Sequence, residues 1–143
     1  MSSLDECRKA SEHLYDALYH MLNGNSCLME SIWSHSPDVT TMHPVGGREV
    51  GWDEVREKWD QLARLTSDGD IKLCDQLIRV EGDIAYEVGT EQGQVKLGRK
   101  KVSMQHRVTN IYRLEAGAWK AVHHHTDISP ALADVVRSLE IKK

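Results

Sequence analysis

The second half of this chain is built from strand-like segments that follow one another with only short turns between them. Between Ile71 and Asp127, alternating apolar and polar residues are interrupted by turn sequences such as Glu81-Gly-Asp83 and Glu115-Ala-Gly117. Strands joined by such short connections pair with antiparallel neighbours, because parallel pairing needs a crossover of a dozen or more residues. The sequence therefore predicts an antiparallel meander over residues 71–80, 84–91, 99–114 and 119–127, with a Gly-punctuated loop at 92–98.

The first half of the chain is mainly helical in pattern. Apolar residues recur every three to four positions across residues 3–22, and Asn23-Gly-Asn25 is a typical helix stop. Helices followed by a meander of strands favour an α+β fold, with the helices on one face of the sheet. The remaining elements that we predict are helices at 26–33 and 52–65, a strand at 39–43, a turn at 44–47 and a short helix after Ser129.

Length and composition limit the kind of protein that this chain can be. Its 143 residues favour one domain spanning positions 1–143. A net charge of −4 argues against a nucleic-acid or anionic-membrane partner. No apolar run approaches the roughly 18 residues of a membrane span, and the acidic N-terminus lacks a signal-peptide core. We therefore expect a cytoplasmic protein.

Alternation along residues 99–114 predicts which side of this strand faces the helices. The even positions are mostly apolar, so we expect them to face inward, which makes His106 and Asn110 polar exceptions in the interior. Buried polar groups need hydrogen-bond partners or a functional role. In the preceding strand the same reasoning assigns Ile84, Tyr86 and Val88 to the inward face.

Three consecutive histidines, His123, His124 and His125, lie in the last predicted strand. His123 and His125 share one face and His124 takes the other, but alternation alone leaves open which face is inward. A His-x-His pair can supply two ligands to zinc. The sequence provides no defined third ligand, and its three cysteines have no CxxC spacing, so we predict neither a metal site nor another cofactor.

The order of these elements, the turn Pro44-Val-Gly46 and the ending Trp119-x-x-x-His123-x-His125 together resemble the nuclear-transport-factor-2-like (NTF2-like) superfamily. The similarity covers residues 4–128 and is greatest to the SnoaL-like and ketosteroid-isomerase-like branches; the association domain of calmodulin-dependent kinase II is a more distant relative. The resemblance implies a cystatin-like α+β cone, in which three N-terminal helices pack on a strongly curved, mainly antiparallel sheet. It also implies a pocket at one end and a homodimer through the outer sheet face.

Three positions match the isomerase pattern individually. The isomerase turn Asp-Pro-Val-Gly, whose aspartate is the general base, corresponds here to a turn that begins with His43. The two hydrogen-bond donors to the enolate oxygen correspond to Tyr19 and Asn110. The resemblance therefore implies catalysis through His43, Tyr19 and Asn110. Both isomerase aspartates are absent here, which argues against steroid isomerisation itself.

We therefore interpret the chain as a pocket protein for a small hydrophobic or carbonyl-bearing ligand. If it is an enzyme, proton transfer of the isomerase or cyclase type is expected. The alternative is a non-catalytic binding or oligomerisation module. By analogy with the kinase association domain, His124 is expected to face the pocket. The residues expected to bind the ligand are Trp33, Trp59, Tyr86, His106 and His124.

Overall fold

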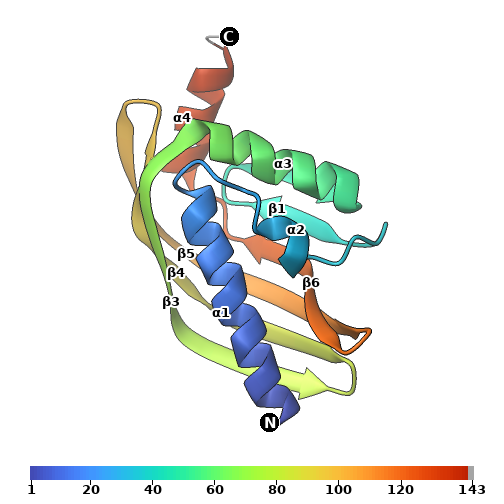
Figure 1. Ribbon diagram of the computed structural model, residues 1–143. Coiled ribbons are helices and arrows are strands. Elements are labelled where there is room, and N and C mark those ends of the chain that lie inside the picture. Colours follow the sequence, from blue (N-terminus) through green and yellow to red (C-terminus); the bar gives the residue numbers. More distant parts are fainter. Residues whose placement is uncertain (142–143) are drawn as a thin grey trace.

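The computed structural model describes residues 1–141, and this part of the chain contains four helices and one six-stranded sheet (Figure 1). The last two residues of the predicted 1–143 domain lie outside it. The helices are α1 (Ser3–Met21), α2 (Met29–Ile32), α3 (Trp52–Leu65) and α4 (Pro130–Ile141). The strands are β1 (Thr40–His43), β2 (Gly46–Val50), β3 (Thr66–Glu81), β4 (Ile84–Leu97), β5 (Lys100–Glu115) and β6 (Ala118–Thr126).

The sheet has the order β2-β1-β6-β5-β4-β3, and only β1 and β6 are parallel neighbours. This confirms the mainly antiparallel α+β fold. Because β1 pairs with the last strand, Thr41 lies opposite His124 and the C-terminal end of β1 runs beside the histidine triplet. The pairing therefore brings His43 close to residues about 80 positions further along the chain.

The helices differ in detail from the predicted arrangement. Only α1 and α2 precede the sheet, α2 is a single turn of four residues, and β1 and β2 lie between α2 and α3. The fourth helix, α4, follows the last strand and packs against β5. The prediction of three N-terminal helices packed on the sheet is therefore only partly correct.

Two segments predicted as non-strand belong partly to strands. The expected turn at 44–47 contains the start of β2, and most of the expected loop at 92–98 belongs to β4. Gly93 occurs within β4 because β3 bulges against it: a Cβ atom at this position would lie 2.1 Å from the carbonyl oxygen of Asp70. The glycine thus marks the close approach of two backbones rather than a loop.

The helices α1 and α3 cover the inner side of the curved sheet (Figure 1). The hydroxyl of Ser2 caps the first turn of α1, and the buried side of this helix carries Cys7, Leu14 and Leu18. The interior joins these residues to aromatic side chains of other elements, including Trp33 and Trp59, which are both 1% exposed. Burial of the apolar sides of α1 and α3 against the sheet creates the core.

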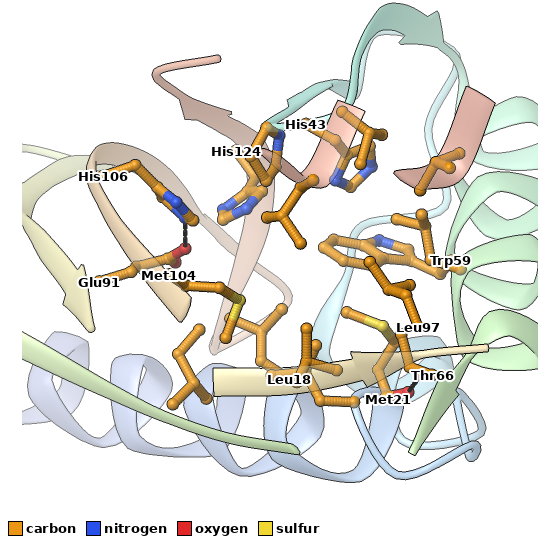
Figure 2. Close-up of a pocket in the computed structure, with 18 residues that line it drawn as sticks. Leu18, Met21, His43, Trp59, Thr66, Glu91, Leu97, Met104, His106 and His124 are labelled. Carbon is orange, nitrogen blue, oxygen red and sulfur yellow. Dashed lines mark hydrogen bonds and ion pairs between the residues drawn. The ribbon is translucent and has the colours of Figure 1, made fainter. Parts of the chain in front are cut away.

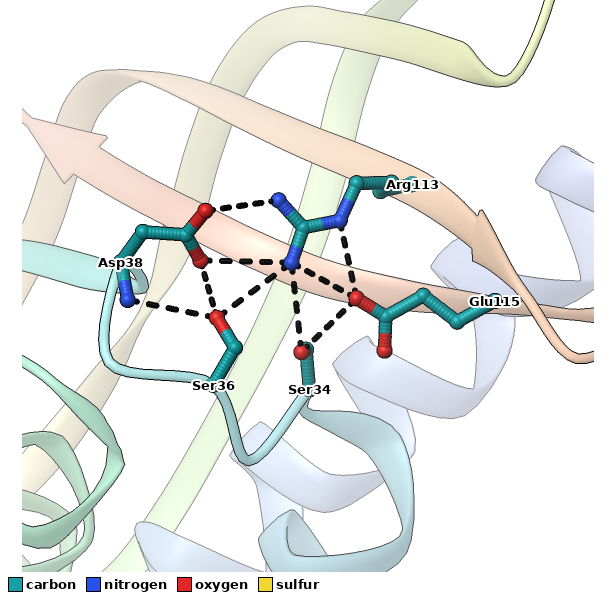
Figure 3. A network of polar contacts seen from close by, with 5 residues as sticks. All are labelled: Ser34, Ser36, Asp38, Arg113 and Glu115. Carbon is teal, nitrogen blue, oxygen red and sulfur yellow. Dashed lines mark hydrogen bonds and ion pairs between the residues drawn. The ribbon is translucent and has the colours of Figure 1, made fainter.

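A polar network fixes the loop that leads from α2 into β1 (Figure 3). Arg113 of β5 donates to Asp38 at 2.9 Å and to Glu115 at 2.6 Å, and Ser34 also donates to Glu115. The hydrogen bond from Arg113 lowers the pKa of the Asp38 carboxyl to about 2. This network holds the loop before β1 against β5.

The pairing registers decide which residues of the long strands point inward. The even positions of β5 from Val102 to Tyr112, including His106 and Asn110, are buried as predicted. In β4 the predicted phase is wrong, because Glu87 lies opposite Asn110 and opposed residues of an antiparallel pair share a face. Glu87 is therefore fully buried, whereas Tyr86 lies on the outer face and is 45% exposed.

A β-bulge in β6 resolves the ambiguity of the histidine triplet. Ile111 pairs with His123 and Tyr112 with Ala121, so Val122 is left unopposed. The extra residue changes the phase of alternation, and both Ala121 and His124 are buried. The inward position of His124 is confirmed, and His125 is exposed.

Candidate functional site

The sheet and three helices, α1, α3 and α4, enclose a cavity of about 60 Å³ (Figure 2). Its wall is mainly apolar, with Leu18 and Met21 from α1, Trp59 from α3, and Leu132 and Val136 from α4. Such a cavity has space for a small ligand or a few water molecules. The polar side chains in the wall are His43, Thr66, Glu91, His106 and His124.

Two imidazole rings, those of His43 and His124, lie side by side in this wall. Their ring centroids are 5.8 Å apart, and the His43 ring meets Trp59 edge to face at 4.5 Å. The pKa of His43 is held well below its usual value mainly by burial, and the proximity of His124 and Lys58 adds a smaller effect in the same direction. Burial also lowers the pKa of His124, although the negative charge of Glu91 partly opposes this effect. Both rings are therefore neutral at pH 7 and can accept a proton.

The ring of His124 is oriented by a hydrogen bond to Asn110. The His124 Nδ1 atom donates a hydrogen bond to the Asn110 side-chain oxygen at 2.6 Å. The Asn110 side-chain nitrogen donates to the hydroxyl of Tyr15 at 3.1 Å and to the carboxylate of Glu87 at 3.0 Å. Because all the polar atoms of the Asn110 side chain are engaged, it has no free donor for a ligand.

Glu91 and His106 form a buried pair in the same wall. The His106 Nε2 atom donates to Glu91 at 2.7 Å, and the hydroxyl of Tyr15 donates to the other carboxylate oxygen at 2.8 Å. Burial alone would raise the pKa of Glu91, but the hydrogen bond from His106, the two neighbouring imidazoles and the hydrogen bond from Tyr15 together outweigh it, so the pKa is lowered. Glu91 is therefore ionised, and both of its oxygens are satisfied.

Two imidazole nitrogens of the cavity wall are buried without a hydrogen-bond partner among residues 1–141, as is the indole nitrogen of Trp59. The two imidazole nitrogens are Nε2 of His43 and Nδ1 of His106. The His43 nitrogen lies 3.6 Å from Glu49, which already accepts a hydrogen bond from Thr41. These atoms retain hydrogen-bonding capacity, as ligand-binding groups do in sites of this kind.

The structure brings together only some of the residues expected at the site. The cavity is lined by His43, Trp59, His106 and His124. Asn110 does not line it but hydrogen-bonds to His124. Trp33 does not line the cavity either; its ring centroid lies 6.1 Å from that of Trp59. Tyr19 is 47% exposed and Tyr86 lies on the outer face, so neither phenol contributes to the cavity wall in the described residues.

Tyr15, Glu87 and Glu91 were not among the site residues predicted from the sequence. Tyr15 lies one helical turn before Tyr19, and its hydroxyl, unlike that of Tyr19, hydrogen-bonds with Glu91 and Asn110. The two glutamates could have been found from the hairpin geometry. If the turn between β4 and β5 is placed at Gly98-Arg99, counting outward pairs Glu91 with His106 and Glu87 with Asn110, as observed.

The other two histidines of the triplet do not share the cavity. The Nδ1 atom of His123 and the hydroxyl of Thr40 share a hydrogen bond of 2.7 Å. The ring of His123 lies 5.8 Å from that of His125. Within residues 1–141, no group of three or more His, Cys, Asp or Glu side chains is arranged to hold a metal ion. No helix in the described part of the chain is long and apolar enough to cross a membrane.

A curved, mainly antiparallel sheet wrapped around helices, with a cavity between them, defines the class of NTF2-like α+β proteins. The profile of the SnoaL-like domain matches residues 12–131, and the chain belongs to this family. No curated protein matches it in the sequence comparison.

Solved structures of the NTF2-like class share this fold. A candidate dehydratase of the NTF2-like family from Streptomyces avermitilis superposes with a TM-score of 0.77 and 21% identity, covering 89% of this chain and 96% of that one. A candidate aromatic ring hydroxylase from Novosphingobium aromaticivorans gives a TM-score of 0.73 at 19% identity, covering 90% and 92%. The CaMKII hub of S. rosetta gives 0.70 at 18% identity, covering 90% and 98%. At these identities the similarity establishes the fold alone.

Proposed function

We propose that this protein binds a small, mainly apolar carbonyl compound in the cavity and transfers a proton on it. The observation that carries the proposal is the pair of neutral, buried imidazoles, His43 and His124, that face one small apolar cavity. A weakly hydrated imidazole is a suitable general base at neutral pH. The description of one structural relative as a candidate dehydratase is consistent with this chemistry.

The hydrogen bonds assign different roles to the two rings. Because Nδ1 of His124 donates to Asn110, a neutral His124 carries its lone pair on Nε2 and can accept a proton from the carbon next to a carbonyl group. A neutral His43 keeps one ring N–H, which can donate to the developing enolate oxygen. In a β-hydroxy ketone, the proton taken by His124 can then pass to the leaving hydroxyl group, so that water departs and a C=C bond forms. In this proposal His124 replaces His43 as the base expected from sequence.

The proposal predicts exchange of α-protons on small ketones. We expect wild-type protein in D₂O to speed this exchange in 4-hydroxybutan-2-one or cyclopentanone, as measured by ¹H NMR. Replacing His124 with alanine should slow the catalysed exchange by about 10²- to 10⁴-fold, since a positioned general base contributes that much. The matched control is His125→Ala, an exposed neighbour on the opposite face, which should exchange like wild type.

Two results would contradict this function. One is a wild-type rate equal to that of buffer on both ketones. The other is an unchanged catalysed rate in a folded His124→Ala variant. Either result would favour the alternative of a non-catalytic binding or oligomerisation module.

We also propose a homodimer through the outer sheet face. Leu77 and Tyr86 are 43% and 45% exposed there, and they pair with the half-buried Val88 and Ile111. Contiguous apolar surface of this kind is typical of protein interfaces. Sedimentation velocity should show a wild-type dimer that Tyr86→Arg converts to monomer. Tyr19→Arg changes an equally exposed tyrosine on α1 and should leave the dimer intact; a monomeric wild type would contradict the proposal.

A further inference from the structure

A fully buried glutamate, Glu87, is linked to the candidate base His124 by two successive hydrogen bonds through Asn110. Its Oε1 atom accepts from Asn110 at 3.0 Å and from the hydroxyl of Tyr112 at 2.8 Å, and its Oε2 atom accepts from Gln76 at 2.7 Å. Its side chain is 0% exposed, and no lysine or arginine among the described residues forms an ion pair with it. A buried carboxylate held only by neutral donors is costly unless it has a specific role.

The position of Glu87 fixes the orientation of the Asn110 amide. The Glu87 oxygen that faces Asn110 accepts from both Asn110 and the hydroxyl of Tyr112, so the Asn110 atom that faces it is the NH₂ group. The second amide hydrogen points to Tyr15, whose own hydroxyl hydrogen is donated to Glu91. The oxygen of the amide is therefore directed at His124.

This orientation in turn selects one neutral form of His124. A carbonyl oxygen accepts, so Nδ1 of His124 must carry the proton and Nε2 must carry the lone pair. If the Asn110 amide were rotated by half a turn, its NH₂ group would face Nδ1 and favour the other tautomer. The rotation would also bring the amide oxygen against the Glu87 carboxylate, which is repulsive inside a protein.

We infer that Glu87 is a positioning residue, which acts through Asn110 to hold His124 in the tautomer with a free Nε2 lone pair. This inference rests on the proposed function, because the tautomer matters for catalysis only if His124 is the base. It assigns the buried carboxylate of β4 a role in ordering the site without contact with the ligand.

The tautomer can be measured directly by two-bond ¹H–¹⁵N correlation spectra of the histidine rings. We expect wild-type protein to show a protonated Nδ1 and an unprotonated Nε2 at His124. In Glu87→Met, which removes the acceptor, the form protonated at Nε2 should become populated, and the ketone exchange rate should fall by about 10²-fold or more, since a wrong tautomer of a catalytic histidine costs up to about 10⁴-fold. The conservative variant Glu87→Gln retains an acceptor oxygen and should recover the wild-type tautomer.

Two further variants separate Glu87 from its neighbours. Tyr112→Phe removes a different donor to the same Glu87 oxygen and should leave the tautomer of His124 unchanged. Tyr15→Phe removes the other acceptor of the Asn110 amide, and Glu87 alone should still hold the tautomer. A change of tautomer in Tyr15→Phe would overturn the inference, because it would transfer the role to Tyr15. This test remains available if Glu87→Met does not fold.

The result for wild-type protein also distinguishes this inference from the proposed function. A wild-type His124 protonated at Nε2, or an unchanged tautomer in folded Glu87→Met, would overturn the role of Glu87. The expected tautomers together with no ketone exchange would support that role and overturn the proposed function. Neither spectrum requires a substrate.

Discussion

Replacing His106 with leucine is expected to lower the free energy of unfolding by about 3–5 kcal/mol at pH 7, because it leaves a buried charge without its partner. Glu91 is 3% exposed and accepts the His106 hydrogen bond at 2.7 Å. Tyr15 remains as a donor to Glu91, but a neutral hydroxyl does not replace an imidazole that can carry charge. Urea unfolding followed by tryptophan fluorescence measures the loss.

The pH dependence of this effect has a definite sign. In wild-type protein the pKa of Glu91 is below its usual value of 4.5, so the pair contributes fully above about pH 4.5 and its contribution is lost as pH falls through the lowered pKa. Without His106, burial dominates and should raise the pKa of Glu91 above that of the unfolded chain. The variant then takes up a proton on Glu91 more readily when folded, and the stability gap to wild type should narrow as pH falls from 7 to 4.

A double variant and a surface variant provide the controls. His106→Leu with Glu91→Leu removes both members of the pair and should recover much of the lost stability, because no buried charge remains. His125→Leu changes an exposed histidine of β6 and should stay within about 0.5 kcal/mol of wild type. If His106→Leu and the double variant were equally destabilised at pH 7, the charge would not be the cause.

Replacing Gly93 with alanine is expected to lower the free energy of unfolding by about 3 kcal/mol, at the upper end of the usual cost of overpacking. The new Cβ atom would lie 2.1 Å from the Asp70 carbonyl oxygen and 2.9 Å from its carbonyl carbon. These are backbone atoms of β3, so the contact cannot be relieved by rotating a side chain. Because the bulge between Ser67 and Asp70 is part of the bend in the sheet, the substitution should also disturb the cavity that the bend encloses.

Gly117 provides a matched control for this substitution. A Cβ atom there would meet nothing within 4 Å, but the backbone φ angle is +81°, so Gly117→Ala should cost about 1–2 kcal/mol through the left-handed conformation alone. Parallel urea titrations of the two variants test the steric explanation. A loss in Gly93→Ala no larger than in Gly117→Ala would contradict it.

The outline of the fold was predictable from local patterns. The spacing of apolar residues in α1, the stop signal after it and the short turns at 81–83 and 115–117 indicated helices followed by an antiparallel meander. Alternation in β5 correctly placed His106 and Asn110 inward. These features follow from contacts between residues close in sequence or on one side of one element.

The candidate site was predictable only in part, because partners from other elements decide it. Tyr15 and Tyr19 lie one turn apart on nearly the same side of α1, and helical spacing cannot tell which of them meets the sheet. The network is decided by where α1 lies along β4 and β5, which brings Tyr15 to Glu91 and Asn110.

Periodicity within single elements was enough to predict where most helices and strands lie and which two polar residues of β5 face inward. The phase of β4, the bulge at Val122 and the resulting inward position of His124 depend instead on how the strands pair. A shift of one residue in pairing exchanges the two faces of a strand, and local propensities are almost equal for the two registers. The buried carboxylates and neutral imidazoles owe their chemistry to that choice of register, because burial and hydrogen-bond partners set which groups carry charge.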